Sequence, residues 1–292
     1  KGMSRNDIVR SIGGYIWNRT SGCKEVIDSS VKQTWKEDGN NSIHEMITPI
    51  GTVRAVHSKT EGEHRSKALR EHFVKDLESL KIMKYIVEAT CVPFIQFAKT
   101  DAGYMNGYYM WMDYREEVDS IIKLYHQKFL EGYRILADGP ADVISTGDNM
   151  DGTMINPQIF KEYAIPFYQD AKKIIEKKGK IFEGHWCGRT QNLLDLVPGC
   201  GLDSVEAIVT KPMADIELKD ALNILQGKVV LQGGIPSVMV CKEGATYVEF
   251  EKYIEEIILP LKGTKGFILG MSDNVPPNAD FRRIEAISEL IK

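Results

Sequence analysis

The chain has 292 residues, of which 43% are hydrophobic and 27% are charged, and its formal net charge at pH 7 is −4. This apolar fraction with so small a net charge excludes a disordered chain. The pI of about 6.0 and the scattered Lys and Arg residues argue against nucleic-acid binding. No apolar run approaches the roughly 20 residues of a membrane span.

The first hundred residues have the least regular pattern. Residues 48–56 predict a turn followed by a strand, which we interpret as part of a hairpin. Residues 67–80 predict a helix, and the short apolar run at 92–95 predicts another strand. Because no Pro-, Gly- or Ser-rich linker divides the chain, we expect residues 1–292 to form a single domain, with an irregular N-terminal part over about residues 1–65 that contains the hairpin.

From about residue 115 the pattern alternates regularly between helix and strand. Helical spacing of apolar residues predicts helices at 116–136, 157–178, 190–196, 217–225, 246–259 and 280–291. Pro157 is expected in the first turn of its helix, with Asn156 as the N-cap. Short apolar runs predict strands at 141–145, 180–183, 204–207, 229–232 and 266–270. Strands that alternate with helices in this way form a parallel sheet.

The residues that follow the strands favour a closed barrel over a doubly wound sheet. No strand is followed by the G-x-G-x-x-G turn of a dinucleotide-binding fold. Polar residues follow the strands instead, and the carboxyl ends of barrel strands converge on one mouth, where active sites are built. We therefore predict an α/β fold, a (β/α)8 TIM barrel. The strand-end residues are Asp148, Asn149, His185, Cys187, Glu206, Gln232, Gly233, Ser272, Asp273 and Asn274.

The sharpest signal for chemistry is His185 followed two residues later by Cys187. Residues i and i+2 of a strand lie on the same side, so the imidazole and the thiol can bind one ion, and this pair of ligands suits Zn²⁺. Glu206 ends the next strand and is a candidate third ligand. Each residue also has a structural alternative. His185 could be a hydrogen-bonded residue at the rim of the barrel, and Cys187 a small buried hydrophobic residue. Glu206 could form an ion pair at the rim.

A fourth ligand is harder to assign. Cys241 follows a strand-end loop, but a structural thiol is the simpler interpretation, and an open position would suit a catalytic zinc ion. Asp148 and Asp273 are the candidates for acid–base catalysis. The alternatives are that Asp148 orients a ligand or caps a turn, and that Asp273 forms the turn before Val275.

The odd number of cysteines, 5, favours a reducing compartment, and we expect a cytoplasmic protein.

Four strand-end motifs together resemble the uroporphyrinogen decarboxylase superfamily, and within it the zinc-dependent, corrinoid-linked methyltransferases. They are HWCG at residues 185–188, LDSVE at 202–206, GGIP at 233–236 and GMSDN at 270–274. The resemblance extends from about residue 48 to the end of the chain. It implies a (β/α)8 barrel, either complete or without its first strand. It also implies zinc ligands at His185, Cys187 and Glu206, and cofactor contacts at Gly233, Gly234 and Asn274.

The chain departs from this pattern at one position. The family's methyltransferases carry a thiolate ligand on the last strand, where Met271 or Ser272 stands here. This difference argues against an enzyme that activates a thiol of the coenzyme M type. It is compatible with the related enzymes that take a methyl group from an ether or amine. The decarboxylases use an Arg-rich N-terminal motif, which is absent here.

The hypothesis is therefore a zinc-dependent methyltransferase. It would move a methyl group between a small ether, amine or thiol and a corrinoid (cobalamin) carried by a partner protein, with Asp148 orienting or protonating the reacting atom. The alternatives are a metal-free carboxy-lyase that decarboxylates a tetrapyrrole, and a barrel that binds a corrinoid or tetrapyrrole without catalysis. No nucleic-acid or membrane partner is expected.

Overall fold

The computed structural model describes residues 4–13, 30–59, 67–83 and 92–291. Cys23 and Cys91 lie outside these residues. The chain divides into two compact units, and each is described by itself. The first comprises Lys1–Gly22, Ala141–Lys161 and Gly179–Lys292, and the second comprises Cys23–Pro140 and Glu162–Lys178. The single domain expected over the whole chain stays a prediction.

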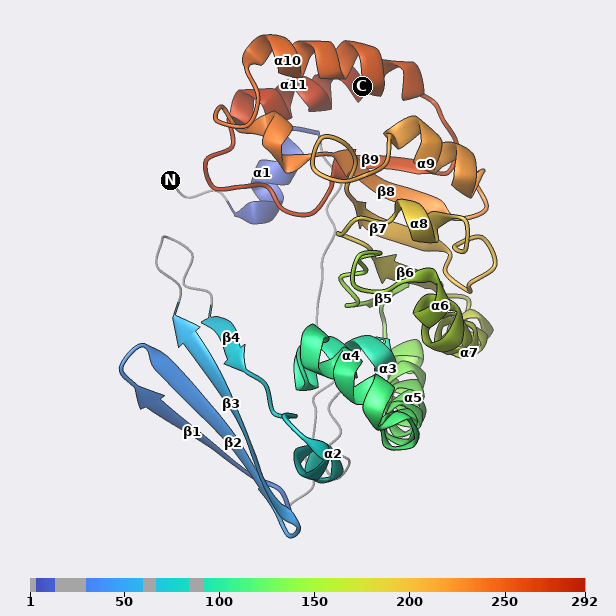
Figure 1. Cartoon of the computed structure of the whole chain (residues 1–292). Coiled ribbons are helices and arrows are strands. Elements are labelled where there is room, and N and C mark those ends of the chain that lie inside the picture. Colours follow the sequence, from blue (N-terminus) through green and yellow to red (C-terminus); the bar gives the residue numbers. More distant parts are fainter. Residues whose placement is uncertain (1–3, 14–29, 60–66, 84–91, 292) are drawn as a thin grey trace. The chain divides into compact units, whose positions relative to one another are not determined.

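The second unit contains a four-stranded antiparallel sheet (Figure 1). Its strands follow in chain order: β1 (Lys32–Asp38), β2 (Asn41–Thr48), β3 (Gly51–Lys59) and β4 (Lys67–Glu71). The hairpin expected around residues 48–56 is confirmed as β2 and β3. The helix expected over 67–80 is wrong in its first half, because β4 pairs with β3, and helix α2 is confined to Leu77–Met83.

The rest of the second unit is helical. The strand expected at 92–95 is wrong: Pro93 opens helix α3, and the whole run is buried. A short apolar run does not by itself distinguish a buried strand from a buried helix. The long helix expected at 116–136 is confirmed as α5. The elements are α3 (Pro93–Ile95), the π-helix η1 (Gln96–Asp101), α4 (Tyr104–Asp113), α5 (Arg115–Asp138), the π-helix η2 (Phe160–Ala164, which begins in the first unit), α7 (Ile165–Ile175) and the 3-10 turn η3 (Glu176–Lys178).

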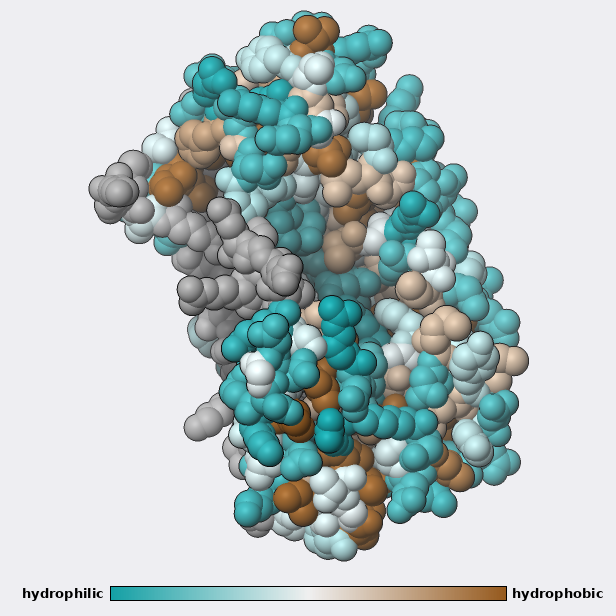
Figure 2. Space-filling view, turned by 60° about the vertical axis from the view of Figure 1, so that its left-hand side comes forward, coloured by the Kyte–Doolittle hydropathy of each residue, from teal (hydrophilic) through white to brown (hydrophobic). Residues whose placement is uncertain are grey.

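The aromatic-rich helix α4 has one buried side and one exposed side. Met110 is buried, whereas Met105, Tyr109 and Met112 are 71%, 59% and 71% exposed. On the face seen in Figure 2, hydrophobic residues lie in small patches among hydrophilic ones, which is ordinary for a protein surface. In the part of the chain that the structure describes, no helix is both long and apolar enough to cross a membrane.

The first unit contains a five-stranded parallel sheet in the order β5-β6-β7-β8-β9 (Figure 1). This consecutive order is the one in which barrel strands follow one another. All five residues of the central strand β7 are buried, as expected for a strand covered on both faces. The strands are β5 (Val143–Thr146), β6 (Ile181–His185), β7 (Ser204–Ile208), β8 (Val230–Ile235) and β9 (Phe267–Met271).

The N-cap expected at Asn156 is confirmed. The Asn156 side chain accepts a hydrogen bond from the Ile159 backbone N–H at the start of α6. Thr246 and Glu249 form a reciprocal capping box at the start of α10. The elements are α1 (Arg5–Ser11), α6 (Pro157–Ile159), α8 (Gln191–Leu194), α9 (Leu218–Leu225), η4 (Ser237–Val240), α10 (Tyr247–Tyr253), η5 (Ile254–Ile258), η6 (Leu259–Leu261) and α11 (Phe281–Ile291).

Candidate functional site

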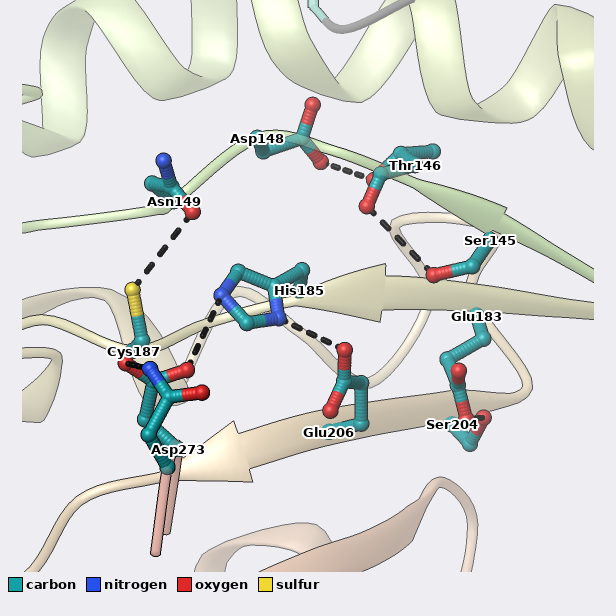
Figure 3. A network of polar contacts seen from close by, with 11 residues as sticks. Ser145, Thr146, Asp148, Asn149, Glu183, His185, Cys187, Ser204, Glu206 and Asp273 are labelled. Carbon is teal, nitrogen blue, oxygen red and sulfur yellow. Dashed lines mark hydrogen bonds and ion pairs between the residues drawn. The ribbon is translucent and has the colours of Figure 1, made fainter. Parts of the chain in front are cut away.

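The candidate site lies within the first unit, at the carboxyl end of β6 (Figure 3). His185 is the last residue of the strand, and Cys187 follows two residues later on the same side, as the alternation of a strand predicts. Trp186, between them, is fully buried on the opposite side and packs edge-to-face on Phe160, with ring centroids 5.5 Å apart. The buried indole therefore anchors the segment that presents the imidazole and the thiol.

The His185 ring is held by Glu206 from the neighbouring strand β7. Nδ1 of His185 lies 2.6 Å from Oε1 of Glu206, and the two side chains are only 14% and 6% exposed. Such a contact places the ring proton on Nδ1 and leaves the Nε2 lone pair available in the neutral ring. Hydrogen bonding with Cys187, and then with Glu206, raises the pKa of His185 to about 10, because both partners favour the protonated ring.

Glu206 lies opposite His185 in the register of β6 and β7, at a bulge of β7 against β8. The register between β7 and β8 shifts between Val205 and Ile208, and Ala207 has a φ of 65°, which is unusual for a residue with a side chain. Bulges bend a strand and re-aim its side chains, and they are frequent beside active sites. Here the bulge follows directly on the carboxylate that holds the histidine.

Cys187 contacts the loop that follows β5. Its Sγ lies 3.7 Å from Oδ1 of Asn149, and Asn149 adopts a left-handed φ of 47°. Asp148, the residue expected to act on the substrate, is fully buried instead. Its carboxylate contacts the Thr146 hydroxyl and points away from the His185 ring in Figure 3. Asn149, at the left-handed turn, therefore lies beside the thiol, and Asp148 does not.

Asp273, at the end of β9, lies on the far side of the imidazole from Glu206 (Figure 3). Its Oδ1 is 3.9 Å from Nε2 of His185, and its side chain is 43% exposed. Its other oxygen, Oδ2, accepts a hydrogen bond of 2.8 Å from the side-chain amide of Asn274. Cofactor contact at Asn274 stays a prediction.

Gly233 and Gly234, also expected to contact a cofactor, are buried where β8 passes the bulge of β7. Gly233 has a φ of 128°, and a Cβ on it would lie 3.0 Å from the backbone N and O of Ile208. A Cβ on Gly234, which has a φ of 95°, would lie 3.0 Å from the Leu218 side chain. These close contacts, with backbone at Gly233 and with a side chain at Gly234, and the two positive φ angles are sufficient to account for both glycines. Cofactor contact at these residues stays a prediction.

Gly233→Ala is expected to lower the free energy of unfolding by about 1–3 kcal/mol, because it combines a strained φ with a backbone contact at the bulge. Urea denaturation measures the change. Gly270→Ala is the matched control: its Cβ would meet nothing within 4 Å, and no left-handed φ is involved. Equal effects of the two substitutions would contradict the close-approach argument.

The resemblance implies a zinc ion held by these side chains. Imidazole, thiol and carboxylate are the donors that zinc prefers. In the described residues, however, no three His, Cys, Asp or Glu side chains are gathered as they are around a bound metal ion. The chemistry of the donors therefore fits zinc, whereas the expected set of His185, Cys187 and Glu206 stays a prediction.

The raised pKa of His185 gives a testable dependence of stability on pH for the metal-free protein. The ring keeps its proton up to about pH 10 when folded, but loses it near 6.5 when unfolded. Between these values the folded state binds more protons, so its stability is greatest below about pH 6.5 and falls as the pH rises. We expect His185→Gln to remove a slope of up to about 1.4 kcal/mol per pH unit from urea denaturation curves. An unchanged slope would contradict the raised pKa.

The parallel sheet, with polar residues at its carboxyl edge, defines an α/β protein of the barrel class. The family model for uroporphyrinogen decarboxylase (URO-D) matches residues 93–292, and the chain belongs to that family. Membership confirms the predicted recognition and the TIM-barrel fold class.

No curated protein matches the chain. Among solved structures, a methyltransferase from Methanosarcina mazei is similar, with a TM-score of 0.57 and 13% sequence identity. The match covers 79% of this chain and 73% of that one. At this identity the likeness is one of fold.

Two residues of the site were not assigned a role from the sequence. Asn149 was noted only as a polar strand-end residue, and Trp186 only as part of a motif. The signal for Asn149 was its place between Asp148 and Met150 in a polar loop, where Asn tolerates a left-handed backbone. The signal for Trp186 was strand alternation, which puts the residue between two donors on the opposite face.

Proposed function

We propose that this protein is a methyltransferase that moves a methyl group between a small ether, amine or thiol and a corrinoid cofactor carried by a partner protein. The observation that carries the proposal is the pairing of an imidazole and a thiol at the end of β6, with a buried carboxylate on the imidazole. Family membership and the fold of the archaeal methyltransferase support it. The odd number of cysteines supports placing the reaction in the cytoplasm.

In this proposal His185 and Cys187 hold a zinc ion through Nε2 and Sγ. Bound zinc supplies Lewis-acid chemistry, which stabilises negative charge on the heteroatom that carries or accepts the methyl group. With zinc bound, Glu206 would keep the remaining ring proton on Nδ1, and Nε2 would provide its lone pair to the ion. Asp148 would need to turn away from Thr146 before it could orient or protonate a substrate.

Two measurements on the purified protein test the proposal. Elemental analysis is expected to find one equivalent of zinc, which is lost in Cys187→Ser. Methyl transfer to free cob(I)alamin, followed by its visible spectrum, is expected with at least one member of a panel of ethers, amines and thiols. Zinc without turnover of any member, together with binding of a corrinoid, would favour a non-catalytic binding protein instead.

The family description favours one other function, the decarboxylation of a tetrapyrrole. Such a substrate carries many carboxylates and requires several cationic contacts. Arg189 is the cation next to the strand-end motif of β6, and it is exposed. Decarboxylation of uroporphyrinogen by a zinc-free preparation, unchanged in Cys187→Ser, would replace the methyltransferase proposal with this one.

A further inference from the structure

Strand β1 forms an open edge of the antiparallel sheet. In the described residues it pairs with β2 alone, and it is the outer strand of that sheet in Figure 1. All seven of its residues, Lys32–Asp38, pair with β2 without a register shift, and six of them are exposed. Such an edge offers backbone N–H and C=O groups to a further strand. β1, which is described in full, contains neither the proline nor the bulge that protects many edges.

Trp35, at the centre of β1, places an exposed aromatic side chain at this edge. The side chain is 57% exposed, although the indole stacks on His44 of β2, with ring centroids 3.9 Å apart and an angle of 12° between the rings. Side chains approach most closely in the non-hydrogen-bonded pairs of an antiparallel ladder, where the backbone N–H and C=O groups point away from the partner strand. The backbone of Trp35 therefore faces the open edge, and the indole stands beside it.

The charges of β1 are complementary to those of a second β1 that runs antiparallel to it. When two copies pair about a two-fold axis at Trp35, Lys32 of each copy lies directly opposite Asp38 of the other. All seven residues of the strand are then paired. Within its own sheet, each of these two charged residues faces an uncharged residue of β2. Opposite charges at directly opposed positions stabilise a pair of strands, whereas like charges destabilise it.

The neighbouring registers do not have this match. With the two-fold axis at Thr34, Lys32 lies opposite Lys36 of the other copy, and with the axis at Lys36 that lysine lies opposite its own counterpart. Both registers place like charges together, and both leave two residues of the strand outside the pairing. Charged residues on an edge strand often prevent pairing with other chains. Those of β1 instead favour a single register.

We propose that β1 is a dimerisation edge, at which two copies of this chain join their antiparallel sheets into one continuous sheet, with the two Trp35 residues opposite each other on the axis. The pairing is isologous, so it closes at two copies and does not grow into a fibre. Because two strands of this length bury less area than a standard interface, we expect a dissociation constant of roughly micromolar order. The proposal depends neither on zinc nor on methyl transfer.

A charge-reversal experiment on the whole chain tests the pairing, with sedimentation velocity over a concentration series as the measurement. Lys32→Asp and Asp38→Lys each place like charges opposite one another at both ends of the paired strands. Each is expected to weaken the dimer by about 10-fold. An equimolar mixture of the two variants has opposite charges at both ends again, and it is expected to form a heterodimer about as tight as the parent dimer. A folding defect in either variant could not produce this recovery.

Trp35→Ala removes the aromatic pair on the axis, and we expect it to weaken the dimer by more than about 30-fold, as for a central interface residue. Glu251→Lys is the matched control for Asp38→Lys, because it changes the net charge by the same amount on the exposed surface of α10. It should dimerise as the parent protein does. Circular dichroism checks that each variant is folded.

Three results would overturn the proposal. The first is a parent protein that stays monomeric throughout the series, even if a strand of another protein is found to bind this edge. The second is a dimer that withstands Trp35→Ala and both charge reversals, because it must form through another surface. The third is a pair of weakened variants that do not recover on mixing, since Lys32 and Asp38 would then not lie opposite each other.

Discussion

His185→Ala is expected to abolish zinc binding and to lower kcat/KM for methyl transfer by about 10³-fold or more. The imidazole is the donor shared by every arrangement considered for this site, with Glu206 on one nitrogen and Asp273 beside the other. A metal ion stabilises the charge that develops in the transition state by several kcal/mol. Each 1.36 kcal/mol of this stabilisation that is lost raises the activation free energy and lowers the rate tenfold. Zinc content and turnover should therefore be lost together.

The matched control is His126→Ala. His126 lies on α5 in the second unit, where its Nε2 is 3.1 Å from Asp170, and its replacement should leave zinc content and turnover unchanged. Because His185→Ala also removes the partner of a buried carboxylate, unfolding of that variant is measured in parallel. A folded, zinc-free His185→Ala that still transfers methyl groups at the parent rate would rule out a zinc mechanism.

Much of the first unit could be predicted from the sequence because its signals are local. The cap at Asn156 depends on residues within one helical turn. The pairing of His185 with Cys187 depends only on strand alternation. These predictions required no knowledge of what lies on neighbouring strands, and the structure agrees with each of them.

The features that were missed depend on contacts between distant segments. Residues 67–71 are good helix formers, yet they form a strand because the edge of β3 is available for pairing. Nothing local indicates that Ala207, next to Glu206, adopts a left-handed φ. The same holds for Asn149: strand alternation cannot place the residues after a strand once the backbone turns left-handed.

The substitution with the largest expected effect on stability is Trp186→Ala. Trp186 is among the largest fully buried side chains, and removal of a buried Trp leaves a cavity that typically lowers the free energy of unfolding by 3–5 kcal/mol. Gly184 leaves room for the ring: a Cβ there would lie 2.9 Å from the indole Nε1. Zinc affinity should fall as well, although the indole faces away from the site, because the two donors flank it in the chain.

Trp186→Phe separates packing from hydrogen bonding. Among the residues that the structure describes, the indole N–H has no hydrogen-bond partner, so phenylalanine removes volume but breaks no polar contact. We expect Trp186→Phe to lose less than half the stability lost by Trp186→Ala in urea denaturation, and to bind zinc nearly as the parent protein does. If the two variants bound zinc equally while differing in stability, packing beneath the strand would not be what positions the imidazole and the thiol, and the loops that carry Asn149 and Asp273 would have to do so.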